Sequence, residues 1–481
     1  MTRRCELLVV GAGPAGMAAA TQSAALGVDT LLLDEQATPG GQIYRAITTT
    51  ALTRPDILGP DYWHGASLLE PLRASGAAYL SGATVWAVSR SAEAGDGDAF
   101  EVAYSVGGQA DILRARHILL ATGALERPFP IPGWTLPGVV TAGAAQILLK
   151  TAAIVPGEHA VLAGGGPLLY LLAWQYLNAG VRIERLLETT APGGLARALP
   201  HALDFLRSPY LAKGLKLMRA VRAHVPITRG VRDLRAQGRE RLESLSYRAG
   251  GRTHDMPARH LMLHQGVVPN LNLSRALGVD HQWNPTQACW QPRVDDWGAT
   301  SVAGIGIAGG DGAGIGGAVA AEHRGRLAAL QAAVALGRID DARRDREARA
   351  PRRALARAMR GRAFFDVLYR PADAYRRPGD DTIVCRCEEI TAGQIRATVR
   401  LGCSGPNQMK AFLRCGMGPC QGRLCGLTVS ELIADERGVP LPEVGYYRLR
   451  FPTKPVTLGE LASLPQTEAS RQAVVRLKKT A

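Results

Sequence analysis

The sequence predicts an α/β protein with two Rossmann-like domains, followed by a small helical domain that is rich in cysteine. Two strand–turn–helix units with glycine-rich turns, at residues 6–34 and 159–187, predict the Rossmann-like domains. Six of the eight cysteines fall within residues 385–425, outside these units. Because 481 residues exceed what one hydrophobic core holds, several domains are expected.

The first unit contains the sequence pattern of a dinucleotide-binding turn, GAGPAG. In this pattern Gly11 permits the tight turn, Gly13 admits the pyrophosphate, and Gly16 lets the helix pack on the strand. The helix that follows would direct its N-terminus at the phosphates. The expected binding residues of this turn are Gly11, Gly13, Pro14, Ala15 and Gly16.

A carboxylate follows at the position where it can bind the ribose of a dinucleotide. Asp34 lies 23 residues after Gly11, at the end of the second strand of the unit. An acidic side chain there accepts hydrogen bonds from ribose hydroxyls. Glu35 is the neighbouring candidate for the same role.

Three later segments indicate which dinucleotide is bound: residues 40–42 (GGQ), residues 121–123 (ATG) and Gly310-Asp311. With the first turn, this set resembles the two-dinucleotide-binding-domain flavoproteins, which include thioredoxin reductase, over about residues 5–335. No CxxC or CxxxxC pair directly follows the GG segment or lies within residues 134–160, so disulfide reduction is not expected. The resemblance implies FAD as cofactor, with contacts from Gly41, Gln42, Val85, Thr122, Gly123 and Asp311.

The second unit departs from the dinucleotide-binding pattern. Its turn reads GGGPLL over residues 164–169, so that Leu169 stands where glycine or alanine is needed for close helix–strand packing. Leu187 occupies the position equivalent to Asp34, and Glu188 follows it. We expect the fold to be retained and disfavour NAD(P) binding, with NADP the less favoured of the two because no arginine follows for its 2′-phosphate.

The clustered cysteines predict a metal centre. Their spacing is C-x-C-x32-C-x4-C, and clustering in a chain of intracellular character favours metal ligation over disulfides. Residues 391–394 (TAGQ) predict a capped helix after the first pair. A structural zinc site is an alternative, although zinc sites more often use CxxC pairs. Cys5 and Cys289 are expected to be ordinary buried thiols.

The segment GMGPCQGRLC, residues 416–425, resembles the bacterioferritin-associated-ferredoxin-like [2Fe-2S] domain. A similar domain ends the large subunit of anaerobic glycerol-3-phosphate dehydrogenase. Cys415 competes with Cys420 for the role of third ligand. The resemblance implies the cluster ligands Cys385, Cys387, Cys420 and Cys425.

The order of these parts resembles the FAD/[2Fe-2S] subunit of heteromeric dye-linked dehydrogenases. This family includes the larger subunits of opine oxidases, the middle subunit of hydrogen cyanide synthase, and hydroxyproline or proline dehydrogenase subunits. The matching segments are Leu31–Arg45, His264–Asn270, Gly309–Gly317 and Val444–Ala462.

The family resemblance implies a division of labour between subunits. A partner similar to D-amino-acid oxidase would oxidise a C–N bond of an amino acid, imino acid or opine. Electrons would pass to the cluster and FAD of this chain, and then to a quinone or dye. Further implications are FMN at a subunit interface and a third subunit that is small and ferredoxin-like. No catalytic residue is expected here; for His264 and Tyr44 we favour hydrogen bonding or flavin packing.

Two other functions remain open: a self-sufficient NAD(P)H-dependent reductase with a fused ferredoxin domain, and a non-enzymatic iron–sulfur sensor. The expected domain organisation has six parts. They are the first part of the FAD-binding domain (1–155), the degenerate Rossmann domain (156–265), the second part of the FAD-binding domain (266–337), an Arg-rich helical linker (338–378), the [2Fe-2S] domain (379–436) and an extended tail (437–481).

Charge and hydropathy limit the partners. The net charge is +15, and residues 338–377 hold thirteen arginines against six acidic residues. This segment lacks aromatic interleaving or a recognition motif, so no nucleic-acid partner is expected, whereas an acidic protein would suit it. The apolar run at residues 160–174 is too short and too broken by glycine to span a bilayer. We expect a cytoplasmic protein, with peripheral attachment to the inner membrane left open.

Overall fold

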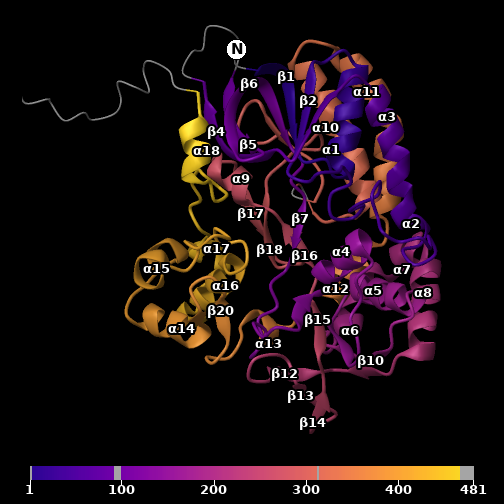
Figure 1. The fold of residues 1–481 in the computed structure, drawn as a ribbon, viewed down its shortest axis with the longest axis vertical. Coiled ribbons are helices and arrows are strands. Elements are labelled where there is room, and N and C mark those ends of the chain that lie inside the picture. Colours follow the sequence, from indigo (N-terminus) through magenta and orange to yellow (C-terminus); the bar gives the residue numbers. More distant parts are fainter. Residues whose placement is uncertain (1–2, 92–98, 311, 313, 466–481) are drawn as a thin grey trace, which may run out of the picture.

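The computed structural model describes residues 3–91, 99–310, 312 and 314–465. In Figure 1 a large sheet lies above a smaller one, and a helical cluster lies beside both. Asp311, one of the predicted flavin contacts, lies outside the described residues.

The first sheet has seven strands in the order β3-β2-β1-β6-β5-β4, with β19 beside β6. Its central strands β1 and β2 are parallel, and residues 7–10 of β1 and 31–33 of β2 are buried aliphatic residues, as expected where strands are covered on both faces. The strands are β1 (Arg3–Val10), β2 (Thr30–Asp34), β3 (Ala78–Ser81), β4 (Thr84–Arg90), β5 (Phe100–Val106), β6 (Gln109–Leu120) and β19 (Ile305–Ile307).

Helix α1 (Pro14–Ala25) packs against α10 (Ala318–Ala335) over the first sheet. Their close approach requires a glycine, because a Cβ at Gly325 would lie 2.1 Å from the carbonyl oxygen of Ala15. The Arg-rich segment forms α11 (Asp341–Met359), which packs on the outer side of α10.

The second sheet has five parallel strands in the order β11-β10-β9-β15-β8. An antiparallel sheet, β12-β13-β14, extends from it. The strands are β8 (Val139–Thr141), β9 (Ala160–Gly164), β10 (Ile183–Glu188), β11 (Ile227–Arg229), β12 (Arg232–Gln237), β13 (Ser244–Ala249), β14 (Arg252–Pro257) and β15 (His260–His264). Helices α4 (Ala142–Ala152), α5 (Pro167–Asn178) and α8 (Tyr210–His224) accompany this sheet.

The chain passes between the two domains twice, at one place. It leaves the first domain through β7 (Ala124–Glu126) and returns through β16 (Val267–Pro269), and these two strands pair antiparallel. This crossing sets the residues after β6 beside those before α9 (Asn272–Ala276).

The cysteine module, residues 379–436, is helical, with a two-stranded β20–β21 hairpin at its start. Its predicted capping box is present at Thr391 and Gln394, at the start of α14. The core of the module also includes Val444, Tyr447 and Leu449, beyond the boundary expected from the sequence. The elements are β20 (Ile383–Cys385), β21 (Ile390–Thr391), α14 (Ala392–Arg400), α15 (Pro406–Leu413) and α16 (Gly426–Arg437).

The C-terminal segment differs from the extended tail that the sequence predicted. It contains two short helices, α17 (Leu441–Val444) and α18 (Leu458–Ser463), and α18 begins with a capping box at Thr457. The segment runs back to the first sheet, where the Thr453 amide donates to the Trp86 carbonyl at 2.8 Å. In the part of the chain described, no helix is both long and apolar enough to cross a bilayer.

Candidate functional site

The turn after β1 can be built only with glycine. Gly11 has φ +105°, and a Cβ on it would lie 2.4 Å from the Ala121 carbonyl oxygen. A Cβ on Gly16 would lie 1.7 Å from the Gly11 carbonyl oxygen. Helix α1 starts at Pro14 without a side-chain cap, so the amide groups of its first turn remain available to an anion.

The other predicted segments converge on this turn. Gly41 has φ +60°, and a Cβ on it would lie 2.8 Å from the Cα of Gly13. A Cβ on Gly310 would lie 3.3 Å from the carbonyl carbon of Gly123. The GG segment, the ATG segment and Gly310, which are far apart in sequence, therefore form one glycine-lined cradle with the first turn.

Asp34 and Glu35 have different surroundings. Asp34 is buried and accepts hydrogen bonds from the amides of Ala12 and, at 2.6 Å, of Gln36; burial raises the pKa of this carboxyl. Its side chain therefore holds the glycine turn in place. Glu35 is partly exposed and forms an ion pair with Lys454 of the C-terminal segment. Of the two acids, Glu35 is the one with an exposed side chain.

Val85 and Thr122 both lie in the first domain. The Val85 side chain is buried in the core with Leu31 and Leu33. Thr122 lies two residues after the end of β6 and adjoins the Gly11 turn.

Two cations that the sequence analysis did not identify adjoin the cradle. Arg45 lies close enough to Asp34 for their charges to interact, and its buried Nε has no hydrogen-bond partner among the described residues. Lys150 donates to the carbonyls of Gln42 and Ile43, at 3.2 and 2.8 Å. Burial lowers the pKa of Lys150 to about 7. The sequence contains only a weak indication of these two cations. Arg45 is the last residue of the GGQIYR segment, whereas Lys150 lies more than 100 residues after that segment.

These features fit the diphosphate of FAD. An uncapped helix N-terminus, a cradle that no Cβ can enter and a buried guanidinium nitrogen without a partner together suit two adjacent phosphates.

The turn of the second Rossmann-like domain is covered by the chain itself. Leu169 is fully buried, and a Cβ on Gly165 would lie 3.6 Å from the ring of Tyr369. Glu188, at the end of β10, accepts a hydrogen bond from Tyr170 at 3.2 Å and pairs with Arg229 at 3.3 Å. Tyr369 and these contacts lie where a nucleotide would bind to this turn.

His264 ends β15 at the same turn. Its Nδ1 lies 2.5 Å from Glu126 Oε1, and Glu126 also accepts from the Gly143 amide at 2.7 Å. These contacts indicate that His264 helps to hold the two segments together. Tyr44 is also buried, and its ring packs against Gly65.

In the cysteine module five thiols lie near one another. Cys415 and Cys425 donate hydrogen bonds to the sulfur of Cys385, which lowers the pKa of Cys385. Cys420 is hydrogen-bonded to both Cys425 and Cys387.

The sixth cysteine of the module, Cys403, lies apart from the other five, with its thiol 3.5 Å from the Gly405 carbonyl. Within the described residues, no three His, Cys, Asp or Glu side chains are arranged as the ligand set of a single metal ion. The observed arrangement is two linked groups: Cys385, Cys415 and Cys425, and Cys387 and Cys420.

Helix α9 connects the glycine cradle to the cysteine module. It follows β16, which pairs with β7 directly after Gly123. Asn272 of α9 donates to the Gln421 carbonyl at 3.2 Å, inside the loop that carries Cys420. Arg275 of α9 lies between two rings, with its guanidinium carbon 5.0 Å from the centre of Trp290 and 4.7 Å from that of Tyr446.

The aromatic contacts continue to the thiols. Tyr446 packs edge-on against Tyr447 with ring centres 5.7 Å apart, and the Tyr447 hydroxyl lies 3.8 Å from the Cys425 sulfur. A cavity of about 20 Å³ lies beside Trp290 and Tyr446, and it is also lined by Leu125 of β7 and Arg423 of the cysteine module. Arg275 of α9 is therefore linked to the thiols through Tyr446 and Tyr447.

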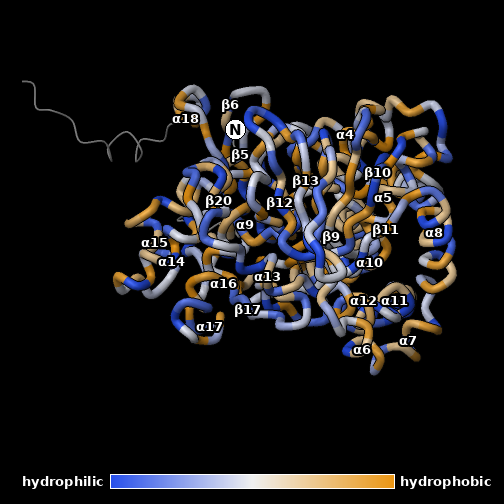
Figure 2. Tube along the Cα trace, turned by 90° about the horizontal axis from the view of Figure 1, so that it is seen from below, coloured by the Kyte–Doolittle hydropathy of each residue, from blue (hydrophilic) through white to orange (hydrophobic). Residues whose placement is uncertain are grey.

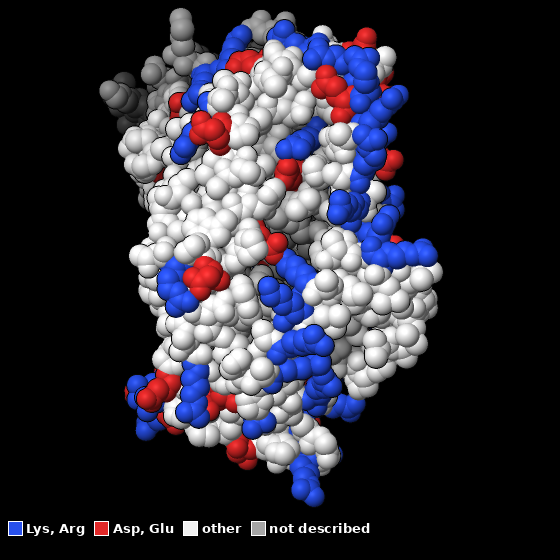
Figure 3. All heavy atoms as spheres, turned by 90° about the vertical axis from the view of Figure 1, so that its right-hand side faces the viewer, with Lys and Arg blue, Asp and Glu red and all other residues white. Residues whose placement is uncertain are grey.

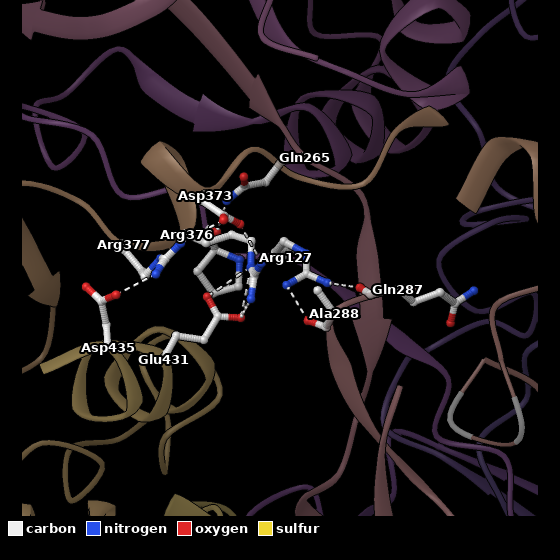
Figure 4. A network of polar contacts seen from close by, with 10 residues as sticks. Arg127, Gln265, Gln287, Ala288, Asp373, Arg376, Arg377, Glu431 and Asp435 are labelled. Atoms are coloured by element: carbon white, nitrogen blue, oxygen red, sulfur yellow. Dashed lines mark hydrogen bonds and ion pairs between the residues drawn. The ribbon is translucent and has the colours of Figure 1, made fainter. Parts of the chain in front are cut away.

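A second contact between the module and the rest of the chain is ionic (Figure 4). Arg376, at the end of α13 (Asp373–Arg376), pairs with the buried Glu431 of α16 at 3.0 Å. Arg127 is also buried and donates to the carbonyls of Ala288 and Gln287, at 3.0 and 2.6 Å. Burial raises the pKa of Glu431 and lowers that of Arg127.

Comparison with known proteins agrees with this architecture. Residues 5–337 match the family described as pyridine nucleotide-disulphide oxidoreductase, and residues 380–464 match the sarcosine oxidase A3 domain. The opine oxidase A-subunit of Agrobacterium tumefaciens (strain Ach5) is 48% identical over 98% of this chain and 93% of that protein. Hydrogen cyanide synthase subunit HcnB of Pseudomonas aeruginosa is 32% identical over 95% of this chain and 98% of that protein.

Solved structures show the same fold. The L-proline dehydrogenase from P. horikoshii superposes with a TM-score of 0.70 at 17% identity, covering 96% of this chain and 80% of that chain. The thioredoxin reductase from T. acidophilum has a TM-score of 0.50 at 17% identity and covers 69% of this chain and 98% of that chain. The prediction of an α/β protein with a Rossmann-like FAD-binding fold is confirmed.

Proposed function

Since this chain belongs to the pyridine nucleotide-disulphide oxidoreductase family and to the family of the opine oxidase A-subunits, we propose that it is the electron-transfer flavoprotein subunit of a heteromeric oxidoreductase. The complex would oxidise the C–N bond of an amino acid, imino acid or opine. The observation that carries the proposal is the convergence of four glycine segments on the uncapped start of α1, near Arg45, whose Nε has no hydrogen-bond partner within the described part of the chain.

FAD would be held in the first domain, and when bound it supplies the capacity to accept and release electrons. The α1 amides and Arg45 would bind its diphosphate, Glu35 would accept a ribose hydroxyl, and Asp34 would keep the turn in shape. The remaining contacts would come from Gly41, Gln42, Thr122, Gly123, Asp311 and the main chain of Val85.

A [2Fe-2S] cluster on Cys385, Cys387, Cys420 and Cys425 would be the second redox centre. Such a cluster contains two irons and is held by four cysteines, so its ligands are spread over a larger space than those of a single metal ion. This arrangement suits the two linked groups of thiols. Cys415 contacts Cys385 and stays the competing ligand. The path Trp290–Arg275–Tyr446–Tyr447 supports electron exchange between the two sites.

The cofactors can be tested directly. After expression with its partner subunits, the chain is expected to release FAD on acid denaturation and to contain iron and acid-labile sulfide in equal amounts. Replacement of Cys385 or Cys387 by Ser should remove the iron and leave the FAD. Zinc, or no metal at all, would contradict the cluster; a preparation without flavin would contradict the whole proposal.

The bond-breaking step would belong to a partner subunit that resembles D-amino-acid oxidase, with FMN at the interface, a quinone as acceptor and a small ferredoxin-like protein as third subunit. The complex would lie in the cytoplasm, at the inner membrane. Co-purification with a tagged copy of this chain, followed by assay with opines, proline, hydroxyproline and glycine, would identify the partner and the substrate. Turnover of any of these by this chain alone would contradict the division of labour.

The coverage of the second glycine turn argues against a self-sufficient NAD(P)H reductase. Because Leu169 and Tyr369 fill this region, anaerobic mixing of the isolated flavoprotein with excess NADH or NADPH should leave the flavin absorbance unchanged. Stopped-flow spectroscopy measures this directly, with dithionite as the positive control. Bleaching by either nucleotide within milliseconds to seconds would favour the reductase.

A further inference from the structure

The second domain exposes a row of leucines. Residues 194–206 form α6 (Gly194–Ala198), the short helix η2 (Leu199–His201) and α7 (Ala202–Leu206), which project from one corner of the molecule in Figure 2. Their spacing places four leucines on one side. The exposed fractions are 61% for Leu195, 60% for Leu199, 61% for Leu203 and 57% for Leu206.

The opposite side of this segment already anchors it to the protein. Ala198 is fully buried, and the ring of Phe205 stacks on Phe364 with centres 4.4 Å apart. Asp204 accepts a hydrogen bond from the Gly361 amide at 2.6 Å. The four leucines are therefore not needed to hold the segment, and they occupy the face that is polar in an ordinary surface helix. A gathered apolar patch of this kind marks an interaction site.

Basic side chains lie on the leucine segment and on α8, the helix that follows it. Residues 194–224 contain six Lys and Arg side chains and a single acidic one, Asp204. Lys213 is paired with Asp61 of α2 (Pro60–Trp63), which leaves five cations, and these are exposed. They are Arg197, Arg207, Lys216, Arg219 and Arg222.

Helix α11 continues the basic surface. The Tyr210 hydroxyl at the start of α8 donates to the Ala358 carbonyl near the end of α11, at 2.6 Å. Figure 3, which looks onto the side of the molecule where α8 and α11 lie, shows basic side chains in a long row with few acidic ones between them. Among the described residues, the exposed arginines of this helix and its C-terminal end without an ion-pair partner are Arg346, Arg349, Arg352, Arg353, Arg357 and Arg360.

We propose that this face docks on a bilayer that contains anionic lipid. The four leucines would enter the boundary between headgroups and acyl chains, and the arginines and lysines around them would remain among the lipid phosphates. The composition favours lipid over a protein partner, because cores of protein interfaces are rich in aromatic residues and the exposed side of residues 195–206 contains none. This inference does not depend on either cofactor.

Vesicle flotation of the purified full-length protein tests the proposal. The protein should float with vesicles of phosphatidylglycerol and phosphatidylethanolamine, and not with vesicles of phosphatidylcholine alone. The variant L195S/L199S/L203S/L206S should bind at least roughly tenfold more weakly. Replacing Arg349, Arg353 and Arg357 by Gln should weaken binding by about fivefold for each residue in lipid contact. At high salt the variant and the unaltered protein should bind equally, because salt screens the attraction between arginine and lipid phosphate.

A matched control variant is L401S/L458S, which removes leucines that are 79% and 84% exposed on α14's end and on α18. It should bind vesicles as the unaltered protein does. Equal binding to neutral and anionic vesicles, or full binding by the four-leucine variant, would overturn the proposal. It would also be overturned if that variant kept its lipid affinity but lost a co-purifying subunit, or changed its molar mass in light scattering, because the leucines would then bind protein.

Discussion

The two adjacent acids at the end of β2 illustrate how neighbouring residues take different roles. Asp34 to Asn should lower the free energy of unfolding by about 2 kcal/mol, because the Ala12 and Gln36 amides lose a charged acceptor. Glu35 is partly exposed, so Glu35 to Gln should change stability by less than about 0.5 kcal/mol, while weakening FAD binding roughly tenfold. Urea unfolding and flavin fluorescence titration separate the effects. Equal loss of FAD affinity in both variants, with no loss of stability in Asp34 to Asn, would contradict the assignment.

A partly buried histidine, His281, predicts how stability changes with pH. His281 is bonded to the Val279 carbonyl at 2.6 Å and to Ser274 of α9 at 3.0 Å, and burial lowers its pKa from 6.5 to about 3. Because the unfolded chain takes up a proton near pH 6.5 and the folded chain does not, stability should fall as the pH drops from about 6.5 towards 3.

The slope from this one group is at most about 1.4 kcal/mol per pH unit. His281 to Gln should flatten the dependence between pH 6.5 and 4 in urea unfolding series. An unchanged slope in the variant would show that other groups control it. His159, which is partly exposed and far from α9, is a suitable control position.

At the scale of the helices, a buried ion pair between α13 and α16 joins the cysteine module to the rest of the chain. Arg376 and Glu431 are 10% and 3% exposed, so Arg376 to Met leaves a buried carboxylate without its partner. Unfolding of the module should become easier by about 3–5 kcal/mol, and the double variant with Glu431 to Met should recover much of this loss.

The neighbouring pair of Arg377 and Asp435 is about one third exposed and serves as the control, since Arg377 to Gln should cost less than about 1 kcal/mol. Differential scanning calorimetry of the holoprotein distinguishes the two cases. Equal destabilisation by Arg376 to Met and Arg377 to Gln would contradict the difference in burial.

Structural features that depend only on residues close together in the sequence were predictable. The strand–turn–helix unit, the glycines of the first turn and the Thr391 capping box depend on neighbours along the chain, and the fold confirms them. The α18 helix was overlooked although Thr457 and Glu460 carry a capping-box signature. The prolines on both sides of this helix favoured the prediction of an extended tail over the prediction of a helix.

Features that depend on distant contacts were not predictable. Lys150 reaches the GGQ segment only because α4 packs against it, and Tyr369, directly after α12 (Arg362–Leu368), reaches the second turn. Likewise, the spacing of the cysteines could not show that Cys415 joins the group around Cys385 while Cys403 stays apart.

At the scale of the whole molecule, the C-terminal segment should strengthen FAD binding. Ending the chain at residue 451 removes the Thr453 contact with Trp86, the Lys454 pair with Glu35 and α18, but keeps Tyr446 and Tyr447 beside the thiols. This truncation should raise the FAD dissociation constant by roughly tenfold or more and leave the iron content unchanged.

Ending the chain at residue 465 is the matched control, because it removes no residue of the described contacts. Its FAD affinity should equal that of the full chain in fluorescence titration. If both truncations bind FAD equally well, the C-terminal segment does not contribute to the flavin site.

The path of the chain also sets the order in which the first domain can be completed during synthesis. The domain takes β1 to β6 from the start of the chain, β19 and α10 after the crossing through β7 and β16, and finally Thr453 and α18 from the end. The first domain can therefore be completed only after the second domain and the cysteine module have been synthesised.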